Sequence, residues 1–530
     1  MIRGYNMESK GKILWIDDEI ELLKPHLILL RQKGYEVETA TNGEDGIELA
    51  RKNSYGLIFL DEMMLGISGL ETLRLLKEIN PYVPVVMVTK NEAETLMEEA
   101  IGRKIDAYLT KPVNPTQILA ICKRFLEYDK INQEKIVQNF LSEVTRIRNL
   151  LNESLLWKDW VDIYIKLVSW SIELDKYPTL GLIEPLRDIF RESNTVFSNF
   201  IEDNYRNFIH SAPNGDLPLF SPQIVDKFLI PYLESNFNVF FFVIDCLRLD
   251  QWLIMEEVLQ QFYKINKNYY FSILPTATPY ARNSIFAGLY PFDIQKHYPQ
   301  YWVGELNTED HKQNAYEKEL LIEQLNRKRV KLRNPLSYIK IHETEFGKKI
   351  ENEITRYAQN HLTAIVVNSV DMIAHSRSDF AILKEIAPDE SAYRSLTRSW
   401  FNHSSLLGML KTLSTFPKVK IVLTTDHGSI RCMRGVKVLG DRETSTSLRY
   451  KFGKNVKSDP RYSMQIQDLT ELRLPKISIT VNNIIAKEDY YFVYPTDYHY
   501  YLQRYKDSFQ HGGISMEEMI IPVVLLEPRT

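Results

Sequence analysis

Short apolar runs alternate with amphipathic stretches over residues 11–127. Runs of this length predict buried strands, and the stretches between them have the spacing of helices. Five such units indicate a doubly wound parallel sheet that is covered by helices on both faces. The runs are ILWID (13–17), VETA (37–40), LIFLD (57–61), VPVVMVT (83–89) and AYLT (107–110).

The middle of the chain shows a different pattern. Between residues 128 and 210, apolar side chains recur at helical spacing, as they do from Ile136 to Ile147, and glycine is almost absent. We predict a helical bundle of about three helices here. The stretch SAPNGDLPLFSP at 211–222 is rich in proline, glycine and serine, and we interpret it as a linker.

An α/β pattern returns over residues 223–530. The segment 291–360 is polar and aromatic, so we expect an insertion over the sheet there. The chain as a whole is therefore predicted to be a multidomain α/β protein. The strand-like runs of this last domain are VFFFVID (239–245), AIVVNSVD (364–371), KIVLTTD (420–426) and MIIPVVLLE (519–527).

Length, charge and cysteine content narrow the class of protein. A chain of 530 residues exceeds one ordinary core. A net charge of −4 gives no electrostatic basis for binding duplex DNA, and no helix-turn-helix pattern with a basic face is visible, which disfavours a DNA-binding transcription factor. No apolar run approaches the roughly 20 residues that span a bilayer, and no signal-peptide pattern is evident. Three isolated cysteines argue against disulfides and a thiolate zinc site, so we expect a cytoplasmic protein with no membrane contact.

Polar side chains stand at the carboxyl ends of the strands predicted for the first domain. Asp17 and Asp18 end the first run, Asp61 ends the third, Thr89 ends the fourth, and Lys111 follows the fifth. In a doubly wound sheet these ends open into one crevice. Three carboxylates suit Mg²⁺, and Asp61 would be the nucleophile that accepts a phosphoryl group. The ammonium of Lys111 would offset the charge that develops on the phosphoryl oxygens.

This pattern resembles the CheY-like receiver domain of bacterial response regulators over residues 11–127. Tyr108 stands at the aromatic switch position of that family, shortly before the Lys-Pro pair. The resemblance implies that a sensor histidine kinase is the partner that leads to phosphorylation of Asp61. Receivers commonly dimerise when they are phosphorylated, so we expect a homodimer in that state.

A second set of chemically active residues lies in separate segments of the last domain. Mixed carboxylate and imidazole ligands suit Zn²⁺, and two metals about 4 Å apart form the usual clamp for displacement at phosphorus. Taken singly, each residue has an ordinary structural explanation, and the weight lies in their order and strand-end positions. The set comprises Asp245, the segment LPTATPYARNSIFAG (274–288), Asp371, His375, Asp426, His427 and His511.

This order resembles the alkaline phosphatase superfamily, particularly its nucleotide pyrophosphatase/phosphodiesterase branch and the PglZ domain. The string HGGISMEEMIIPVVLLEP is similar to the C-terminal motif of PglZ domains. The resemblance implies two zinc ions. One would be bound by Asp371, His375 and His511. The other would be bound by Asp245, Thr278, Asp426 and His427.

The motif PTATP offers two threonines as the nucleophile. In the phosphodiesterase branch the second threonine of Pro-Thr-x-Thr attacks, which implies Thr278, with Thr276 supporting the turn. Arg282 and Asn283 follow on the same segment and are candidates for contacting a substrate phosphate. A role facing the helix is the equal alternative for both.

A receiver, a helical bundle and a PglZ domain in one chain resemble the PorX-like response regulators, a family associated with type IX secretion. The resemblance implies a metal-dependent phosphodiesterase that acts on linear or cyclic oligonucleotides. The alternative is a phosphorylation-controlled adaptor, for example one that binds a sigma factor, in which metals only stabilise the domain.

Overall fold

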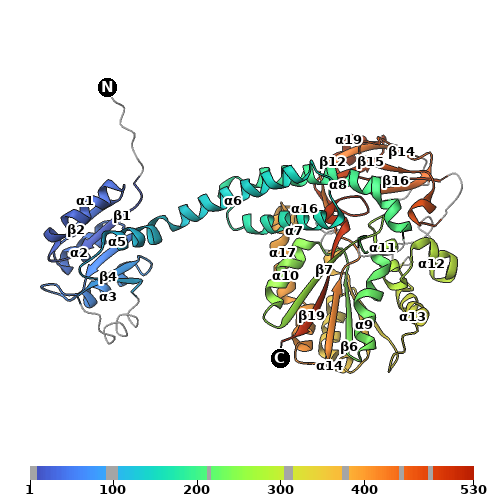
Figure 1. The fold of residues 1–530 in the computed structure, drawn as a ribbon, viewed down its shortest axis with the longest axis horizontal. Coiled ribbons are helices and arrows are strands. Elements are labelled where there is room, and N and C mark those ends of the chain that lie inside the picture. The colour runs from blue at the N-terminus through green and yellow to red at the C-terminus, as the bar shows by residue number, and fades with distance from the viewer. Residues whose placement is uncertain are drawn as a thin grey trace. The chain divides into compact units, whose positions relative to one another are not determined.

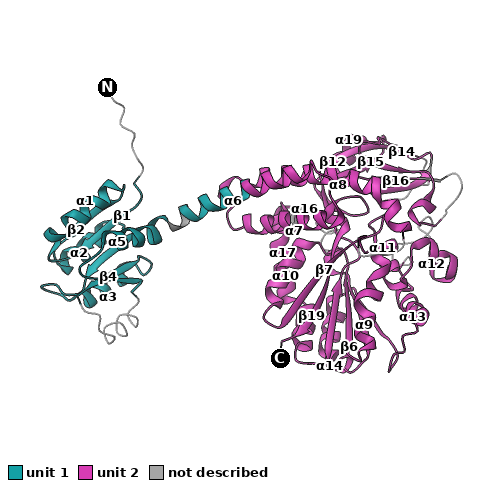
Figure 2. Cartoon of the chain, viewed as in Figure 1, with its two compact units in different colours: residues 1–141 teal, residues 142–530 magenta. Residues whose placement is uncertain are grey.

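The computed structural model describes residues 9–90, 105–211, 216–303, 314–372, 381–440, 447–475 and 481–529. The chain divides into two compact units, residues 1–141 and residues 142–530 (Figure 2). Each unit is treated by itself below. In the part of the chain that the structure describes, no helix is both long and apolar enough to cross a membrane.

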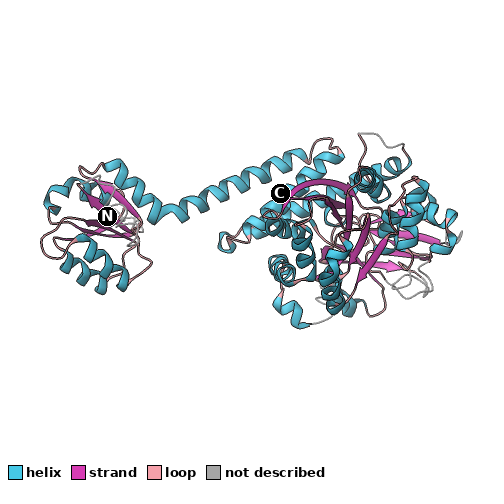
Figure 3. Cartoon of the chain, turned by 90° about the horizontal axis from the view of Figure 1, so that it is seen from below, coloured by secondary structure: helices cyan, strands magenta, loops and turns pink. Residues whose placement is uncertain are grey.

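The first unit contains a five-stranded parallel sheet in the order β2-β1-β3-β4-β5 (Figure 1). The apolar runs predict a doubly wound parallel sheet, and this prediction is confirmed. In Figure 3 the strands of this unit lie between helices on both sides. The strands are β1 (Lys12–Ile16), β2 (Glu36–Ala40), β3 (Leu57–Asp61), β4 (Val85–Thr89) and β5 (Ala107–Thr110). The helices are α1 (Lys24–Gln32), α2 (Gly43–Lys52), α3 (Gly69–Ile79) and α5 (Pro115–Cys122).

Three long helices follow, as the sequence predicts: α6 (Tyr128–Leu150), α7 (Trp157–Leu174) and α8 (Ile183–His210). Helices α7 and α8 pack together through Trp160 and Phe197, whose ring centroids are 5.3 Å apart. Phe197 also packs edge-on against Phe271 of the following domain at 6.0 Å. Helices α7 and α8 therefore share a core with the last domain instead of forming a separate bundle.

The larger unit is built around a six-stranded mixed sheet in the order β7-β19-β10-β6-β9-β8. Strands β10, β6, β9 and β8 are parallel, whereas β19 runs antiparallel to both of its neighbours. The predicted α/β architecture is therefore confirmed. The strands are β6 (Asn238–Ile244), β7 (Tyr263–Phe271), β8 (Ser337–Ile341), β9 (Leu362–Val367), β10 (Val419–Thr424) and β19 (Ile520–Pro528).

Helices pack around this sheet, and two of them matter for the site. Helix α11 (Thr278–Ala287) begins at the candidate nucleophile, and helix α13 (Glu317–Arg327) packs against α11. The others include α10 (Leu249–Leu259), α12 (Pro291–His297), α14 (Thr344–Tyr357), α17 (Glu390–His403) and α18 (Ser405–Leu413).

Two regions differ from the sequence analysis. The stretch 291–360, expected to be an insertion, supplies strand β8 and helix α14, so its last part belongs to the main α/β layer. Residues 430–510 contain a group of short strands that the sequence analysis did not identify. They are β11 (Ile430–Cys432), β12 (Arg434–Leu439), β13 (Tyr450–Lys454), β14 (Lys457–Ser458), β15 (Ser463–Ile466), β16 (Val481–Ala486), β17 (Tyr490–Val493) and β18 (Ser508–Gln510).

Candidate functional sites

The first site lies at the carboxyl edge of the sheet in the smaller unit. Ligand atoms of Asp17, Asp18 and Asp61 all lie within 4.8 Å of one another. Lys111 Nζ is 2.9 Å from Asp61 Oδ2 and 2.9 Å from Asp17 Oδ2. Burial raises the pKa of Asp61, while the hydrogen bond from Lys111 opposes this shift. This oxygen-only set with an adjacent ammonium fits Mg²⁺ and a phosphoryl group.

The two expected switch residues lie on neighbouring strands. Thr89 ends β4, and Tyr108, which lies in β5, is 48% exposed. In the register of the sheet, Asp61 pairs with Val88 of β4. Thr89 is the next residue along β4. The structure thus brings Thr89 to the edge that carries Asp61, and Tyr108 is on the adjoining strand.

The second site begins where two adjacent parallel strands end. Asp245 follows β6, and the pair Asp426-His427 comes shortly after β10, which lies beside β6 in the sheet. Ligand atoms of these three buried residues lie within 4.8 Å of one another. The hydroxyl of Thr278, the first residue of α11, is 3.0 Å from His427 Nε2 and 3.4 Å from Asp245 Oδ1. The four residues expected to hold one zinc ion are therefore together.

Local hydrogen bonds orient the ligands of this group. His427 Nδ1 is 3.0 Å from the carbonyl oxygen of Gly428, so Nδ1 carries the proton and the lone pair of Nε2 faces Thr278. Asp426 Oδ1 accepts from the backbone N–H groups of Cys246 and His427, at 3.3 and 3.1 Å. Asp426 Oδ2 accepts no hydrogen bond from the described residues. Asp426 Oδ2 lies 3.5 Å from Arg282 Nε and 3.7 Å from His427 Nε2. An imidazole nitrogen and a carboxylate oxygen that lie this close together in a buried site fit a bound cation.

Burial also sets the charge state of this group. It lowers the pKa of His427, which keeps the imidazole neutral as a metal ligand requires. It raises the pKa of Asp245 to about 7, against the opposing effect of the Arg282 guanidinium. Burial likewise raises the pKa of Asp426. Carboxylates that resist ionisation when buried are stabilised by a cation, so these shifts agree with the donor set.

The residues expected for the other zinc ion lie beside the first group. His511 stacks on His427 with ring centroids 4.2 Å apart, and its Nε2 is 4.0 Å from Asp371 Oδ1. Its Nδ1 is 3.3 Å from the carbonyl oxygen of Thr276. Asp371 lies in a helical turn beyond the end of β9 instead of directly at the strand end. His375 lies outside the described residues.

The two threonines of the PTATP motif have different surroundings. The Thr276 hydroxyl is buried and engaged on both sides, because it donates to Gly513 O at 2.8 Å and accepts from Gly512 N at 3.1 Å. It therefore holds two chain segments together. The Thr278 hydroxyl instead faces His427 and Asp245, which favours Thr278 as the nucleophile.

Arg282 points toward carboxylates of the site. Its guanidinium is almost fully buried and lies 3.0 Å from Asp245 Oδ2 and 3.0 Å from Glu317 Oε1. The side chain of Asn283 donates to Pro279 O at 2.9 Å, which is a contact within its own helix. These contacts favour the helix-facing alternative for Asn283 and a charge-balancing position for Arg282. Sequence reasoning missed Glu317, because it lies in the segment interpreted as an insertion.

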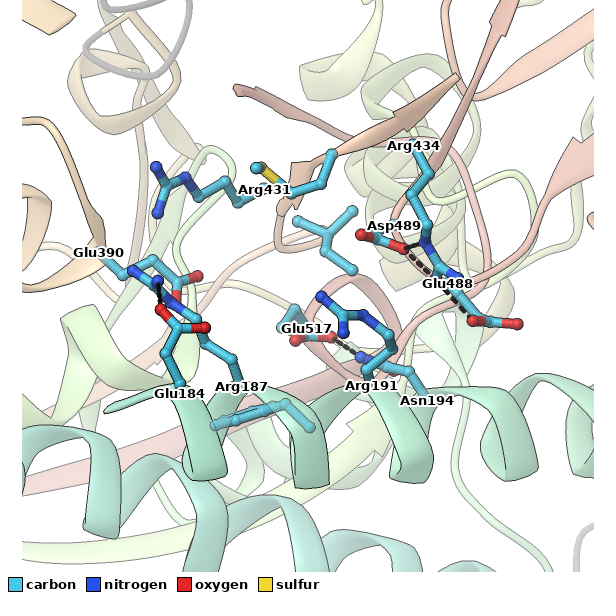
Figure 4. A pocket seen from close by; sticks show the side chains of 13 residues that line it. Glu184, Arg187, Arg191, Asn194, Glu390, Arg431, Arg434, Glu488, Asp489 and Glu517 are labelled. Atoms are coloured by element: carbon cyan, nitrogen blue, oxygen red, sulfur yellow. Dashed lines mark hydrogen bonds and ion pairs between the residues drawn. The ribbon is translucent and has the colours of Figure 1, made fainter. Parts of the chain in front are cut away.

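The structure also contains a cavity of about 230 Å³ that is lined by other residues (Figure 4). None of its lining residues is a candidate metal ligand. Its walls come from α8, from the start of α17 and from the short-strand region, and they carry side chains of both charges. Its labelled lining residues are Glu184, Arg187, Arg191, Asn194, Glu390, Arg431, Arg434, Glu488, Asp489 and Glu517.

Three family models match the chain in succession. The response regulator receiver domain matches residues 13–123, the PorX response regulator linker domain matches residues 130–209, and the BREX system PglZ alkaline phosphatase-like domain matches residues 224–526. The last match alone covers more than half of the chain.

Individual proteins resemble shorter parts of the chain. The uncharacterized transcriptional regulatory protein YkoG of Bacillus subtilis is 33% identical over 130 residues, which are 24% of this chain and 56% of YkoG. The transcriptional regulatory protein SrrA of Staphylococcus aureus is 30% identical over 116 residues, which are 22% of this chain and 48% of SrrA. The chain therefore spans about half the length of these curated relatives.

Solved structures also resemble part of the chain. A CheY-like receiver domain protein from Methanospirillum hungatei is 27% identical and covers 23% of this chain and 97% of its own, with a TM-score of 0.22. The response regulator DrrB of Thermotoga maritima is 33% identical and covers 23% of this chain and 54% of its own, with a TM-score of 0.21.

Proposed function

Because the chain belongs to the PglZ alkaline phosphatase-like family, here preceded by a response regulator receiver and a PorX-type linker, we propose that it is a response regulator whose output is a zinc-dependent phosphodiesterase. Its substrates are linear or cyclic oligonucleotides. A sensor histidine kinase is the source of the phosphoryl group on Asp61, and the phosphorylated chain forms a homodimer. We place the protein in the cytoplasm and link it, through its resemblance to PorX-like regulators, to type IX secretion.

One observation carries the enzymatic proposal: the Thr278 hydroxyl lies 3.0 Å from His427 Nε2, beside Asp245 and Asp426. A threonine hydroxyl is a weak nucleophile at neutral pH and needs activation. Zinc bound by this set would favour the alkoxide and offset the negative charge of the phosphoryl oxygens. An adaptor protein has no need of a hydroxyl aimed into such a ligand set.

The residues then have distinct roles in a two-step reaction. Thr278 Oγ loses its proton and forms a bond to phosphorus, the P–O bond to the leaving alcohol breaks, and the departing alcohol takes up one proton, so that no net proton is gained or lost. The product of this step is a phosphothreonine ester, which water hydrolyses to restore the hydroxyl. Thr278 is the first residue of α11, so the positive end of the helix dipole lies near the charge that develops on phosphorus. His427 and Asp245 hold the attacking oxygen in place.

The test uses the purified full chain, elemental analysis for zinc, and a panel of monoester, linear diester and cyclic nucleotide substrates. Thr278→Ala should lose turnover by several orders of magnitude and retain its zinc, because removal of a nucleophile removes a whole step. Thr278→Ser should keep measurable turnover. Thr276→Ala is the matched variant and should lose much less. The proposal fails if the zinc-loaded wild type hydrolyses no phosphodiester, which would favour the adaptor alternative and its sigma-factor partner.

A further inference from the structure

One face of helix α8 carries three buried polar side chains that bind the main chain of the phosphoesterase site. They are Asn194, Ser198 and Tyr205, and their spacing places them on one side of the helix. Buried polar groups are costly unless they are hydrogen-bonded, and each of these makes a specific bond. Their partners lie in the two segments that carry Thr278 and His511.

Asn194 and Ser198 contact the segment that follows His511. Asn194 Oδ1 accepts from Met516 N at 2.9 Å. Asn194 Nδ2 donates to Glu517 Oε2 at 2.9 Å (Figure 4). Ser198 Oγ donates to Ile514 O at 3.2 Å. The helix therefore holds Ile514, Met516 and Glu517, which follow a candidate metal ligand closely in the chain.

Tyr205 contacts the segment that leads to the nucleophile. Its hydroxyl accepts from Leu274 N at 2.8 Å, four residues before Thr278. The Thr276 hydroxyl joins this segment to Gly512 and Gly513, as described above. Both segments are thus bonded to each other and to the same helix.

The segment that follows His511 also contacts the residues next to His427. Gly428, which follows His427, donates its N–H to Glu518 O at 3.2 Å. A Cβ at position 428 would overlap the carbonyl oxygen of Glu517, so these two segments of the chain are in direct contact there. Glu518 also pairs with the buried Arg449 and accepts from Gly513 N at 2.7 Å. A displacement of residues 514–518 would therefore also move the segments that carry His427 and His511.

Helix α8 is held firmly enough to act as a support. Phe197 packs edge-on against Phe271 at 6.0 Å, and Tyr205 packs edge-on against Phe220 at 5.6 Å. Lys487 pairs with Glu202 on the same helix. Displacing reacting groups by about 1 Å can cost 100-fold in rate, so a rigid support of this kind has a direct effect on chemistry.

We infer that Asn194, Ser198 and Tyr205 are positioning residues of the phosphoesterase site, so that the helical segment following the receiver is part of the catalytic framework. This inference rests on the proposed function for its effect on turnover. It also has a consequence that is independent of turnover, because groups that orient metal ligands affect metal affinity.

The experiment compares Asn194→Leu, Tyr205→Phe and Ser198→Ala in the zinc-loaded full chain. With a linear phosphodiester such as bis(p-nitrophenyl) phosphate, we expect kcat to fall about tenfold for the first two variants while KM stays within about twofold. We expect zinc affinity, measured by competition with a chelator, to fall about tenfold in the same variants. Ser198→Thr retains the hydroxyl and should stay close to wild type.

Ser193→Ala is the matched control. Ser193 is a buried neighbour of Asn194 on α8, and its hydroxyl has no hydrogen-bond partner among the described residues. This variant should leave kcat, KM and zinc affinity unchanged. If Asn194→Leu does not fold, Tyr205→Phe, which removes one oxygen atom, still decides the question. The inference is overturned if kcat and zinc affinity of Tyr205→Phe both stay within twofold of wild type. A wild type without turnover refutes the proposed function, and the zinc affinities then test the inference alone.

Discussion

Glu517 offers a sharp test of how the contact between α8 and the site is stabilised. Its carboxyl is buried and accepts a hydrogen bond from Asn194. Burial raises its pKa from 4.5 to about 7, and the nearby Arg248 opposes that shift while Glu390 adds to it. Tyr164 is a further titratable neighbour. In the folded protein this carboxyl therefore holds its proton up to nearly neutral pH.

The sign and size of the effect on stability follow from these two pKa values. Between pH 4.5 and pH 7 the folded state holds a proton that the unfolded state has released, so stability falls as pH rises through this window. The whole pKa difference changes the free energy of unfolding by about 3 kcal/mol. About 2 to 3 kcal/mol of this is lost as the pH rises from 5 to 8. Glu517→Gln cannot ionise and retains an oxygen that can accept from Asn194. We expect it to be more stable than wild type by about 1 kcal/mol at pH 5 and by about 3 kcal/mol at pH 8.

The measurement is denaturant unfolding of the larger unit, followed at pH 5 and at pH 8 for both proteins. Glu184→Gln is the matched control, because Glu184 lines the same cavity but is largely exposed. It should show the same difference from wild type at both pH values. A stability gain of Glu517→Gln that is equal at pH 5 and pH 8 would refute the reasoning, since a change in packing alone has no such pH dependence.

Three further results are expected. Beryllofluoride with Mg²⁺ should convert the wild type from monomer to dimer in light scattering, whereas Asp61→Ala should stay monomeric, and identical masses for the wild type in both conditions would contradict the dimer proposal. Chelation of metal should abolish hydrolysis and lower the melting temperature of the larger unit in calorimetry, with little change in the receiver step, and an unchanged profile would argue against the ligand set. Arg282→Met should destabilise the metal-free larger unit by about 3 to 5 kcal/mol in denaturant titrations, because Asp245 and Glu317 lose their shared guanidinium, and a change under 1 kcal/mol would show that the ion pairs contribute little.

The sequence predicted the buried strands well and missed the two edge strands of the six-stranded sheet, for a physical reason. Strands β3 and β6 are buried along almost their whole length, so they read as continuous apolar runs. Strand β7, YKINKNYYF, stands at the edge of the six-stranded sheet and is exposed in its middle. Strand β8 is the other edge and is only partly buried. Neither has the apolar run that identified the others.

The candidate ligands could be predicted because their positions are tied to strand ends, whereas their partners could not. The pair Arg449 and Glu518 joins residues far apart in the sequence, and no local pattern indicates which distant residue a buried glutamate will meet. Glu317 is a second example, because its ion pair with Arg282 forms only after α13 packs on α11. Contacts of this kind depend on tertiary packing and not on periodicity.

Both sites share a feature that bears on the order of folding and metal binding. In the receiver, Lys111 contacts Asp17 and Asp61 simultaneously. In the larger unit, Arg282 similarly lies between Asp245 and Glu317. Each cation reduces the repulsion among carboxylates that folding brings together, so we expect these carboxylates to stay together when the metal is removed. Metal removal should therefore weaken the larger unit without unfolding it, unlike domains in which the metal itself drives folding.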